Sequence, residues 1–264
     1  MRLTGGVGGC NIHIIDVSLT KQLIMKNILL LAAFTMAGLC SFAQNDKVIK
    51  DNNAQKRDVK GFHAIRIGGG IDLYLSQGEE EGVAVSASSS EYRDRIRTEV
   101  ENGVLNIYLN TEGFHWGISG DRHMKAYVSV KQLDVLKASG GSDVYIQDWI
   151  KSGKLDINLS GGSDLKGKVA AQDLSIVQSG GSDSFVSGTA AQLSVHATGG
   201  SDFHGYDFVV DACEVDASGG SDINITVNKE LNVSASGGSD VYYKGSASVR
   251  TLHSSGSSDV VKKG

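Results

Sequence analysis

The sequence Ser139-Gly-Gly-Ser-Asp143 recurs seven times, nearly unchanged, in the second half of this 264-residue chain. The aspartates that end the copies advance by 21, 19, 19, 20, 18 and 19 residues. A repeat of this length is typical of solenoids, in which one supersecondary unit stacks on the next because a single unit cannot bury its apolar face alone. The copies are Ser139–Asp143, Ser160–Asp164, Ser179–Asp183, Thr198–Asp202, Ser218–Asp222, Ser236–Asp240 and Ser255–Asp259, the last with Gly-Ser in place of Gly-Gly.

Apolar and polar residues alternate in the segment before each copy, for example in Leu155–Leu159 and Leu193–Ala197. This period of two predicts a strand with one buried and one solvated face. A second apolar element follows each aspartate, as in Val144, Leu165 and Phe185-Val186. The repeats therefore predict an all-β solenoid with two or three strands per coil, about 19 residues per coil and apolar columns inside.

The glycine pair between the two elements is predicted to form a corner of the coil, because glycine adopts positive φ without a steric penalty. A loose segment such as Gly188–Ala191 is expected to link each coil to the next. The chain has no proline, which fits strands that need every ladder donor. The predicted corner glycines are Gly140, Gly141, Gly161, Gly162, Gly180, Gly181, Gly199, Gly200, Gly219, Gly220, Gly237, Gly238 and Gly256.

Residues 58–130 differ in texture from the repeat region 131–264 but still alternate in strand fashion. Asn102-Gly103 is a hairpin turn signal, and Glu91–Arg97 is compatible with one or two helical turns. We interpret 58–130 as an irregular β cap that protects an open sheet edge, with Gly68–Gly70 as a further corner. Residues 44–57 are predicted to be a polar tether.

Residues 25–43 have the pattern of a secretory signal peptide: a charged start, the apolar run Ile28–Leu39, and Ser41-Phe42-Ala43. Cleavage is predicted between Ala43 and Gln44. Residues 1–24 form an upstream extension. Export to the periplasm, the outer surface or the medium is expected. Cys40 leaves open a lipoprotein form, although Leu39 is larger than the residue that such signals place before the cysteine.

The formal net charge of −5 becomes −7 from Gln44 onward, because the segment before it carries +2. An acidic chain without basic clusters is a poor candidate for binding nucleic acid or anionic lipid. No segment after the signal is long enough to span a membrane as a helix. Of Cys10, Cys40 and Cys213, only Cys213 would remain, which excludes a disulfide framework and a multi-cysteine metal site. It is predicted to pack in a leucine slot.

The block Ile96–Ile107, together with Gly61-Phe62, Gly69–Leu73 and the repeated glycine turns, resembles the auto-transporter adhesin head GIN domain family. The resemblance covers about residues 58–262. It implies a right-handed parallel β-helix similar to pectin-lyase-like folds, an exported location and a role in adhesion.

The aspartates of the copies form the one regular column of potential ligands. A row of calcium ions is one hypothesis, but each turn offers one carboxylate where calcium takes six to eight oxygens. The alternative is that each carboxylate accepts turn hydrogen bonds from backbone N–H groups or the neighbouring serine hydroxyl. The column consists of Asp143, Asp164, Asp183, Asp202, Asp222, Asp240 and Asp259.

Catalytic readings have little support in the sequence. Asp156, Glu214 and Asp216 could share one face with His196, but a solvated sheet looks the same. His63, His115 and His123 lack metal-ligand spacing, and no cofactor is expected. Four aromatic residues are candidates for contacts with sugars or a protein: Trp149, Tyr206, Tyr242 and Tyr243.

The sequence thus favours a non-catalytic exported protein that presents a polar β-sheet as an adhesion or scaffold surface. Host or cell-surface glycans or proteins are the expected partners, and the oligomeric state is open. A carbohydrate-binding or carbohydrate-active protein of related fold is one alternative. A structural or stress-related protein of the cell envelope is another.

Overall fold

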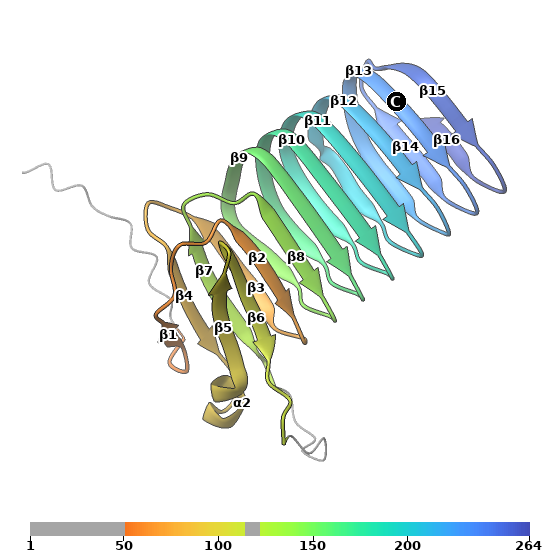
Figure 1. Cartoon of the computed structure of the whole chain (residues 1–264). Coiled ribbons are helices and arrows are strands. Elements are labelled where there is room, and N and C mark those ends of the chain that lie inside the picture. Colours follow the sequence, from red (N-terminus) through yellow and green to blue (C-terminus); the bar gives the residue numbers. More distant parts are fainter. Residues whose placement is uncertain (1–50, 114–121) are drawn as a thin grey trace, which may run out of the picture. The chain divides into compact units, whose positions relative to one another are not determined.

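The computed structural model describes residues 51–113 and 122–264, which are almost entirely β. They contain a parallel β-solenoid of about seven coils spaced roughly 19 residues apart, which confirms the predicted fold class (Figure 1). The signal segment 25–43 with its Ala43–Gln44 cleavage, the extension 1–24 and Cys40 lie outside the described residues, as does His115.

Each coil has two arms, one on either side of a glycine turn. The five long strands start after one turn and run to the next: β9 (Val144–Ser160), β10 (Leu165–Ser179), β11 (Ser184–Thr198), β12 (Phe203–Ala217) and β13 (Asp222–Ala235). Their first halves pair in one sheet and their second halves in another. We call these the post-turn sheet and the pre-turn sheet. The post-turn sheet continues through β14 (Asp240–Lys244) and β16 (Asp259–Lys262), and the pre-turn sheet through β15 (Ser248–Ser254).

The two halves of a long strand are joined by a bend, not by the loose segment that the sequence predicted. Within Gly188–Ala191, Gly188 pairs with Phe208 and Ala190 pairs with Val210 in the next coil. Small side chains let the strand bend, and stacking of each bend on the next keeps most of the backbone ladder intact. Register shifts, such as that between Phe185 and Gly188, accommodate the differences in coil length.

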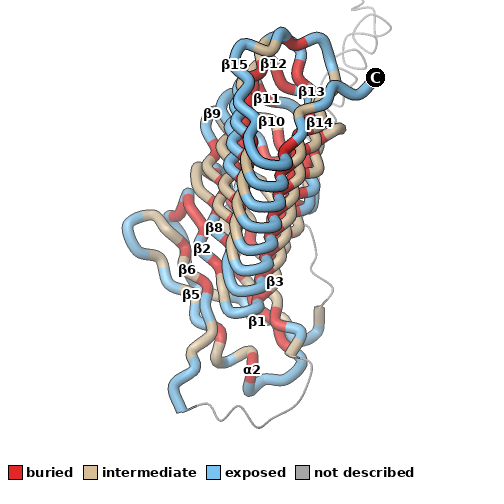
Figure 2. Tube along the Cα trace, turned by 90° about the vertical axis from the view of Figure 1, so that its right-hand side faces the viewer, coloured by how far each residue is buried: buried red, intermediate tan, exposed pale blue. Residues whose placement is uncertain are grey.

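Apolar columns fill the space between the sheets, and Figure 2 shows buried and exposed residues alternating along each coil. Cys213 lies between Leu193 and Leu231 in one column and is 3% exposed, as predicted. Phe185 corrects the expected core: it points outward and is 40% exposed, whereas Ser184 is fully buried. The inward column at this position runs through Leu165, Ser184 and Phe203.

The N-terminal region forms one more coil and a cap. β2 (Ala64–Gly68) and β3 (Asp72–Gln77) flank the Gly68–Gly70 corner. They lie between β6 (Val104–Leu109) with β7 (Lys125–Val130) on one side and β8 (Val135–Ser139) with β9 on the other. After β3 the chain leaves the solenoid and returns to it at β6. Because β6 and β7 lie on one side of β2 and β3, and β8 and β9 lie on the other, the chain crosses the β2–β3 coil between β7 and β8.

Antiparallel strands close this end of the solenoid. β4 (Gly82–Ser86) pairs with β7, and β5 (Ile96–Glu101) pairs with β6 through the predicted Asn102-Gly103 hairpin. Helix α2 (Ser90–Arg95) lies between them in the chain and overlaps the predicted helical turns Glu91–Arg97, of which the last two residues belong to β5. Within the predicted tether 44–57, Gln55–Arg57 forms β1 on β4, and Arg57 Nη2 donates to Arg93 O at 3.1 Å.

Within the described ranges, no helix combines the length and the apolar character that crossing a bilayer would require.

Candidate binding surface

The aspartate of each turn binds the neighbouring coil. In five of the turns its Oδ1 accepts a hydrogen bond from the backbone N–H of the next aspartate in the column, while Asp240 N donates to Ser221 O at 3.2 Å. The N···Oδ1 distances from Asp164, Asp183, Asp202, Asp222 and Asp259 to the preceding aspartate are 3.1, 3.2, 3.1, 2.9 and 3.1 Å. The carboxylate therefore accepts a hydrogen bond from a backbone N–H, as the turn hypothesis predicted. The N–H belongs to the turn of the next coil and not to the same turn.

The column has an eighth member that the repeat pattern does not reveal. Asp72 follows the Gly68–Gly70 corner, and its Oδ1 accepts from the N–H of Asp143 at 3.4 Å. Each turn still contributes a single carboxylate to the column. In residues 51–113 and 122–264, no three His, Cys, Asp or Glu side chains are grouped as a metal ion would need.

A buried serine column runs beside the aspartate column with opposite polarity. The serine that directly precedes the aspartate in each turn is almost fully buried. Its N–H donates to Oγ of the serine in the following coil, at 3.1 Å from Ser142 to Ser163 and 3.2 Å from Ser163 to Ser182. Its Oγ also donates to the first residue of its own turn, as from Ser201 to Thr198 O at 3.0 Å. Sequence reasoning missed this role, although serine occupies this position in all seven copies.

The two glycines of a turn are not equivalent. The first has positive φ in every turn, whereas the second does so only at Gly141, Gly162 and Gly181. A side chain on the first would also approach the preceding coil: a Cβ on Gly237 would lie 2.7 Å from Gly219 O, against 3.6 Å for Gly238. This difference explains why the seventh copy tolerates Ser257 at the second position.

The outer surface of the post-turn sheet carries an aromatic row two residues beyond the aspartates. Tyr74 stacks between Tyr127 and Tyr145, with ring centroids 5.2 Å apart on each side. Phe185 stacks on His204 at 4.5 Å, and Lys166 lies over its ring at 5.1 Å. The residues in this register are Tyr127, Tyr74, Tyr145, Lys166, Phe185, His204, Asn224, Tyr242 and Val261.

The aspartates fix the tyrosines of this row. Tyr145 Oη donates to Asp143 Oδ2 at 3.2 Å, and Tyr242 Oη donates to Asp240 Oδ2 at 2.9 Å. Burial and then the Asp143 carboxylate raise the pKa of Tyr145 to about 12. Burial, followed by the charges of Asp202 and Asp240, raises the pKa of Asp222 above its ordinary value. Tyr145 and Tyr242 therefore present protonated hydroxyls that donate to the aspartates beside them.

The pre-turn sheet places Glu214 and Asp216 on one face of β12 but does not bring Asp156 to them. Asp216 and His196 pair at 3.2 Å between adjacent coils, and both are exposed. Asp156 lies in the same row as Glu214, but Ser175 and Ser194 separate them. Three coil spacings correspond to about 14 Å. Of the histidines considered, His63 pairs with Asp134 at 3.1 Å, and His123 has a positive φ of 41°.

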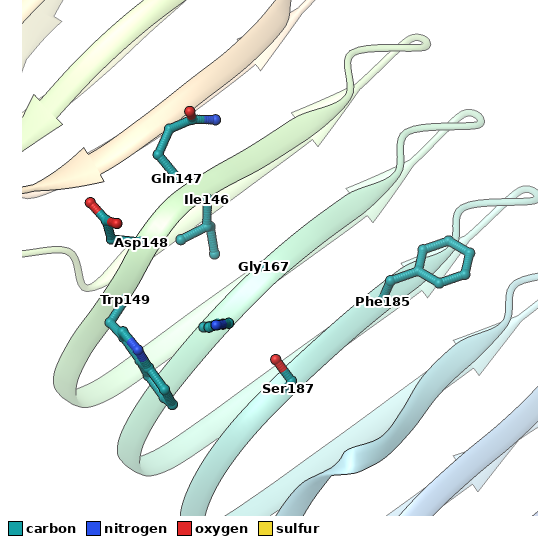
Figure 3. A pocket seen from close by; sticks show the side chains of 8 residues that line it. Ile146, Gln147, Asp148, Trp149, Gly167, Phe185 and Ser187 are labelled. Carbon is teal, nitrogen blue, oxygen red and sulfur yellow. The ribbon is translucent and has the colours of Figure 1, made fainter. Parts of the chain in front are cut away.

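Two shallow hollows interrupt the outer surfaces. A groove of about 300 Å³ lies on the post-turn sheet between Trp149 and Phe185, with Gly167 at its centre (Figure 3). A wider hollow of about 570 Å³ lies over β2, β5 and β6, where Arg66, Glu99 and Tyr108 face outward. The remaining candidate aromatics are separate: Tyr206 lies beneath Lys244 at 4.5 Å, and Tyr243 is half-buried against the core.

Comparison with known families gives one match. A family model described as "Putative auto-transporter adhesin, head GIN domain" matches residues 61–247. Curated protein sequences gave no match.

Several solved structures share the fold. A "putative adhesin" from Bacteroides fragilis is 18% identical, with a TM-score of 0.72 over 80% of this chain and 96% of that one. A "putative adhesin" from Parabacteroides merdae is 19% identical, with a TM-score of 0.61 over 80% and 95%. A "putative lipid binding protein" from Parabacteroides distasonis is 22% identical, with a TM-score of 0.60 over 80% and 98%. At these identities the likeness concerns the fold alone.

Proposed function

Because this chain belongs to the head GIN domain family of adhesin-like proteins, we propose that it is a non-catalytic exported recognition protein whose post-turn sheet binds surface glycans or proteins. Residues 25–43 direct its export in this proposal, and the mature chain begins at Gln44. Mass spectrometry of the protein recovered from cell fractions tests this start and separates a soluble form from a lipid-modified Cys40.

The observation that carries the proposal is the aromatic row of the post-turn sheet. Tyr127, Tyr74 and Tyr145 form a continuous stack that two flanking coils hold in register. Aromatic rings on a rigid backbone supply contact area at a low cost in conformational entropy, which is why they are enriched in binding surfaces. Among residues 51–113 and 122–264, the pre-turn sheet carries no comparable stack of rings, and Asp156 lies three coils from Glu214.

The proposal is tested by binding of the labelled chain to a panel of matrix proteins, glycans and intact cells. The double variant Tyr74→Thr/Tyr145→Thr keeps β-forming side chains but removes the central stack, so it should lose at least tenfold in affinity, about 1.4 kcal/mol. Tyr108→Thr is the matched control, because Tyr108 is a 41%-exposed tyrosine on β6 in the pre-turn sheet. Equal binding by both variants, or turnover of any glycan by the wild-type chain, would contradict the proposal.

A further inference from the structure

We infer that the groove between Trp149 and Phe185 binds one pyranose ring of a neutral glycan. The inference rests on the proposed function and names a ligand class and a site within the post-turn sheet. Neither residue belongs to the tyrosine stack on which the proposed function depends.

Three neighbouring coils build the groove. β9 contributes Ile146 and Trp149, β10 contributes Gly167, and β11 contributes Phe185 (Figure 3). Gly167 leaves the floor open, and a side chain there would collide with Ile146, which is 8% exposed. The floor is therefore shallow, and the packing of Gly167 against Ile146 fixes it.

The two aromatic walls are exposed and held in place. Trp149 is 42% exposed and Phe185 is 40% exposed. The indole reaches across to β11, because a Cβ built on Gly188 would lie 2.9 Å from Trp149 Cζ3. Lys168 lies 5.9 Å from the indole ring, while His204 and Lys166 hold Phe185 as described above. Little rotamer freedom is left to lose on binding, which lowers the cost of association.

Polar side chains make up most of the remaining lining of the groove. Gln147 and Asp148 come from β9, Lys168 from β10 and Ser187 from β11. They offer both donors and acceptors. A pyranose ring presents C–H groups on its faces and hydroxyls at its rim. The C–H groups complement the negative face of an aromatic ring, and the hydroxyls complement the polar rim.

The same features argue against other ligand classes. An acyl chain or an apolar peptide needs a contiguous apolar patch, whereas polar side chains stand between these two rings. An anionic polymer would meet Asp148 in the groove itself, where Lys168, the one cation of the lining, already lies over the indole. Like charges at contact distance repel. A neutral sugar avoids both costs.

The size of the groove limits what one site can hold. About 300 Å³ is at the lower end of ligand pockets, so the groove suits a single sugar unit and not an oligosaccharide. A longer glycan would cross the groove and continue along the post-turn sheet. Binding at one unit is expected to be weak, in the millimolar range, and to strengthen on a multivalent surface.

The test uses the full chain with Trp116→Phe, which leaves Trp149 as the one tryptophan. Its fluorescence is titrated with a panel of neutral hexose and N-acetylhexosamine oligosaccharides, with heparin, and with phosphatidylcholine vesicles. We expect a saturable change with at least one neutral oligosaccharide and none with heparin or vesicles. NMR saturation transfer to the same sugar then compares Trp149→Ala, Phe185→Ala and the control Tyr108→Ala, each checked by its melting curve.

A loss of at least tenfold in affinity for the first two variants, with Tyr108→Ala unchanged, supports the inference. Retention of sugar binding by Trp149→Ala and Phe185→Ala would place the sugar elsewhere. A response to heparin or vesicles alone, or no response to any of the three, would overturn the ligand class. If cells or matrix proteins are bound through the tyrosine stack while Trp149→Ala has no effect on any ligand, the inference fails and the proposed function stands.

Discussion

The carboxamide of Gln77 pairs with the backbone of Lys151 as a neighbouring strand would. Its Oε1 accepts from Lys151 N at 2.7 Å, and its Nε2 donates to Lys151 O at 3.0 Å. The same Nε2 donates to Lys131 O at 3.1 Å. Because the chain leaves the solenoid after β3, the coil formed by β2 and β3 has no bend to pair with the bend of β9. The side chain of Gln77 supplies the missing partners for the backbone of Lys151.

We therefore expect Gln77→Ala to lower the free energy of unfolding by about 1 to 2 kcal/mol, because three hydrogen bonds to backbone groups are lost. Gln77→Glu should be intermediate, since it keeps the acceptor and loses the donor. Urea unfolding measures both, and hydrogen exchange at Lys151 should accelerate. Gln192→Ala, an exposed glutamine in a regular coil, is the control. A cost equal to that of the control would show that solvent replaces the carboxamide.

The two glycines of the sixth turn should respond differently to the same substitution. Gly237 has φ of 76° and little room beside Gly219 O, so Gly237→Ala is expected to cost about 2 kcal/mol or more. Gly238 does not have positive φ, and Gly238→Ala should change stability by less than about 1 kcal/mol. Thermal unfolding of the pair decides this, and equal effects would contradict the assigned turn geometry.

Ser201 tests the buried serine column. Its Oγ accepts from Ser182 N at 3.3 Å and donates to Thr198 O at 3.0 Å. Ser201→Ala leaves both backbone groups without this partner in a fully buried place, so we expect a loss of about 1 to 3 kcal/mol. Ser194→Ala, on the exposed face of the same coil region, should be within about 0.5 kcal/mol of wild type. Denaturant midpoints at constant m-value provide the comparison, and a neutral Ser201→Ala would rule out a structural role for the hydroxyl.

Asp222 makes the aspartate column sensitive to pH. Burial and two neighbouring carboxylates raise its pKa, so the folded chain binds this proton more tightly than the unfolded chain. The resulting stabilisation is fully present below a pH of about 3.9 and is lost as the pH rises through the raised pKa. Asp222→Asn keeps an acceptor without the charge. It should raise the melting temperature at pH 7 and reduce the change in melting temperature as the pH rises above about 4.

Asp207→Asn, outside the column, is the matched control for this charge effect. The same melting curves with calcium and with a chelator address the cation hypothesis. A rise with calcium that Asp222→Asn abolishes, together with destabilisation of that variant at pH 7, would show that the column holds a cation.

Cys213 should be inert in the folded chain. It is 3% exposed, and burial followed by the charge of Glu214 raises the pKa of its thiol. In a chain carrying Cys10→Ser and Cys40→Ser, an aromatic disulfide reagent should react at the rate of global unfolding and rapidly only in denaturant. Fast modification of the native chain would contradict the column that places Cys213 between two leucines.

Several features followed from the sequence because they depend on local pattern. The spacing of the aspartates gave the coil length, the alternation before each turn gave one inward face, and Asn102-Gly103 gave a hairpin. The expectation for Phe185 was wrong because Ser184 precedes it in a run with no clear alternation. Hydrophobicity favoured Phe185 as the inward residue, whereas the neighbouring coil offers the bulk of Phe203 and leaves space for a serine.

The binding surfaces could not be derived in the same way, because their residues are brought together by register between coils. Trp149 and Phe185 are far apart in the sequence and line one groove only because β9, β10 and β11 stack, with a register shift between β9 and β10. The tyrosine stack likewise needs β3 to lie between β7 and β9, an order that the chain does not follow.

The sequence by itself determined that the chain forms a β-solenoid with glycine corners and apolar columns, because these features depend on repeat length and alternation along one strand. Only the tertiary structure decided that aspartates of the column bind N–H groups of the next coil, that the serine column runs the other way, and which rings share a face. Those contacts join residues about 20 positions apart or more, and their partners are set by the stacking register and the direction of each donor.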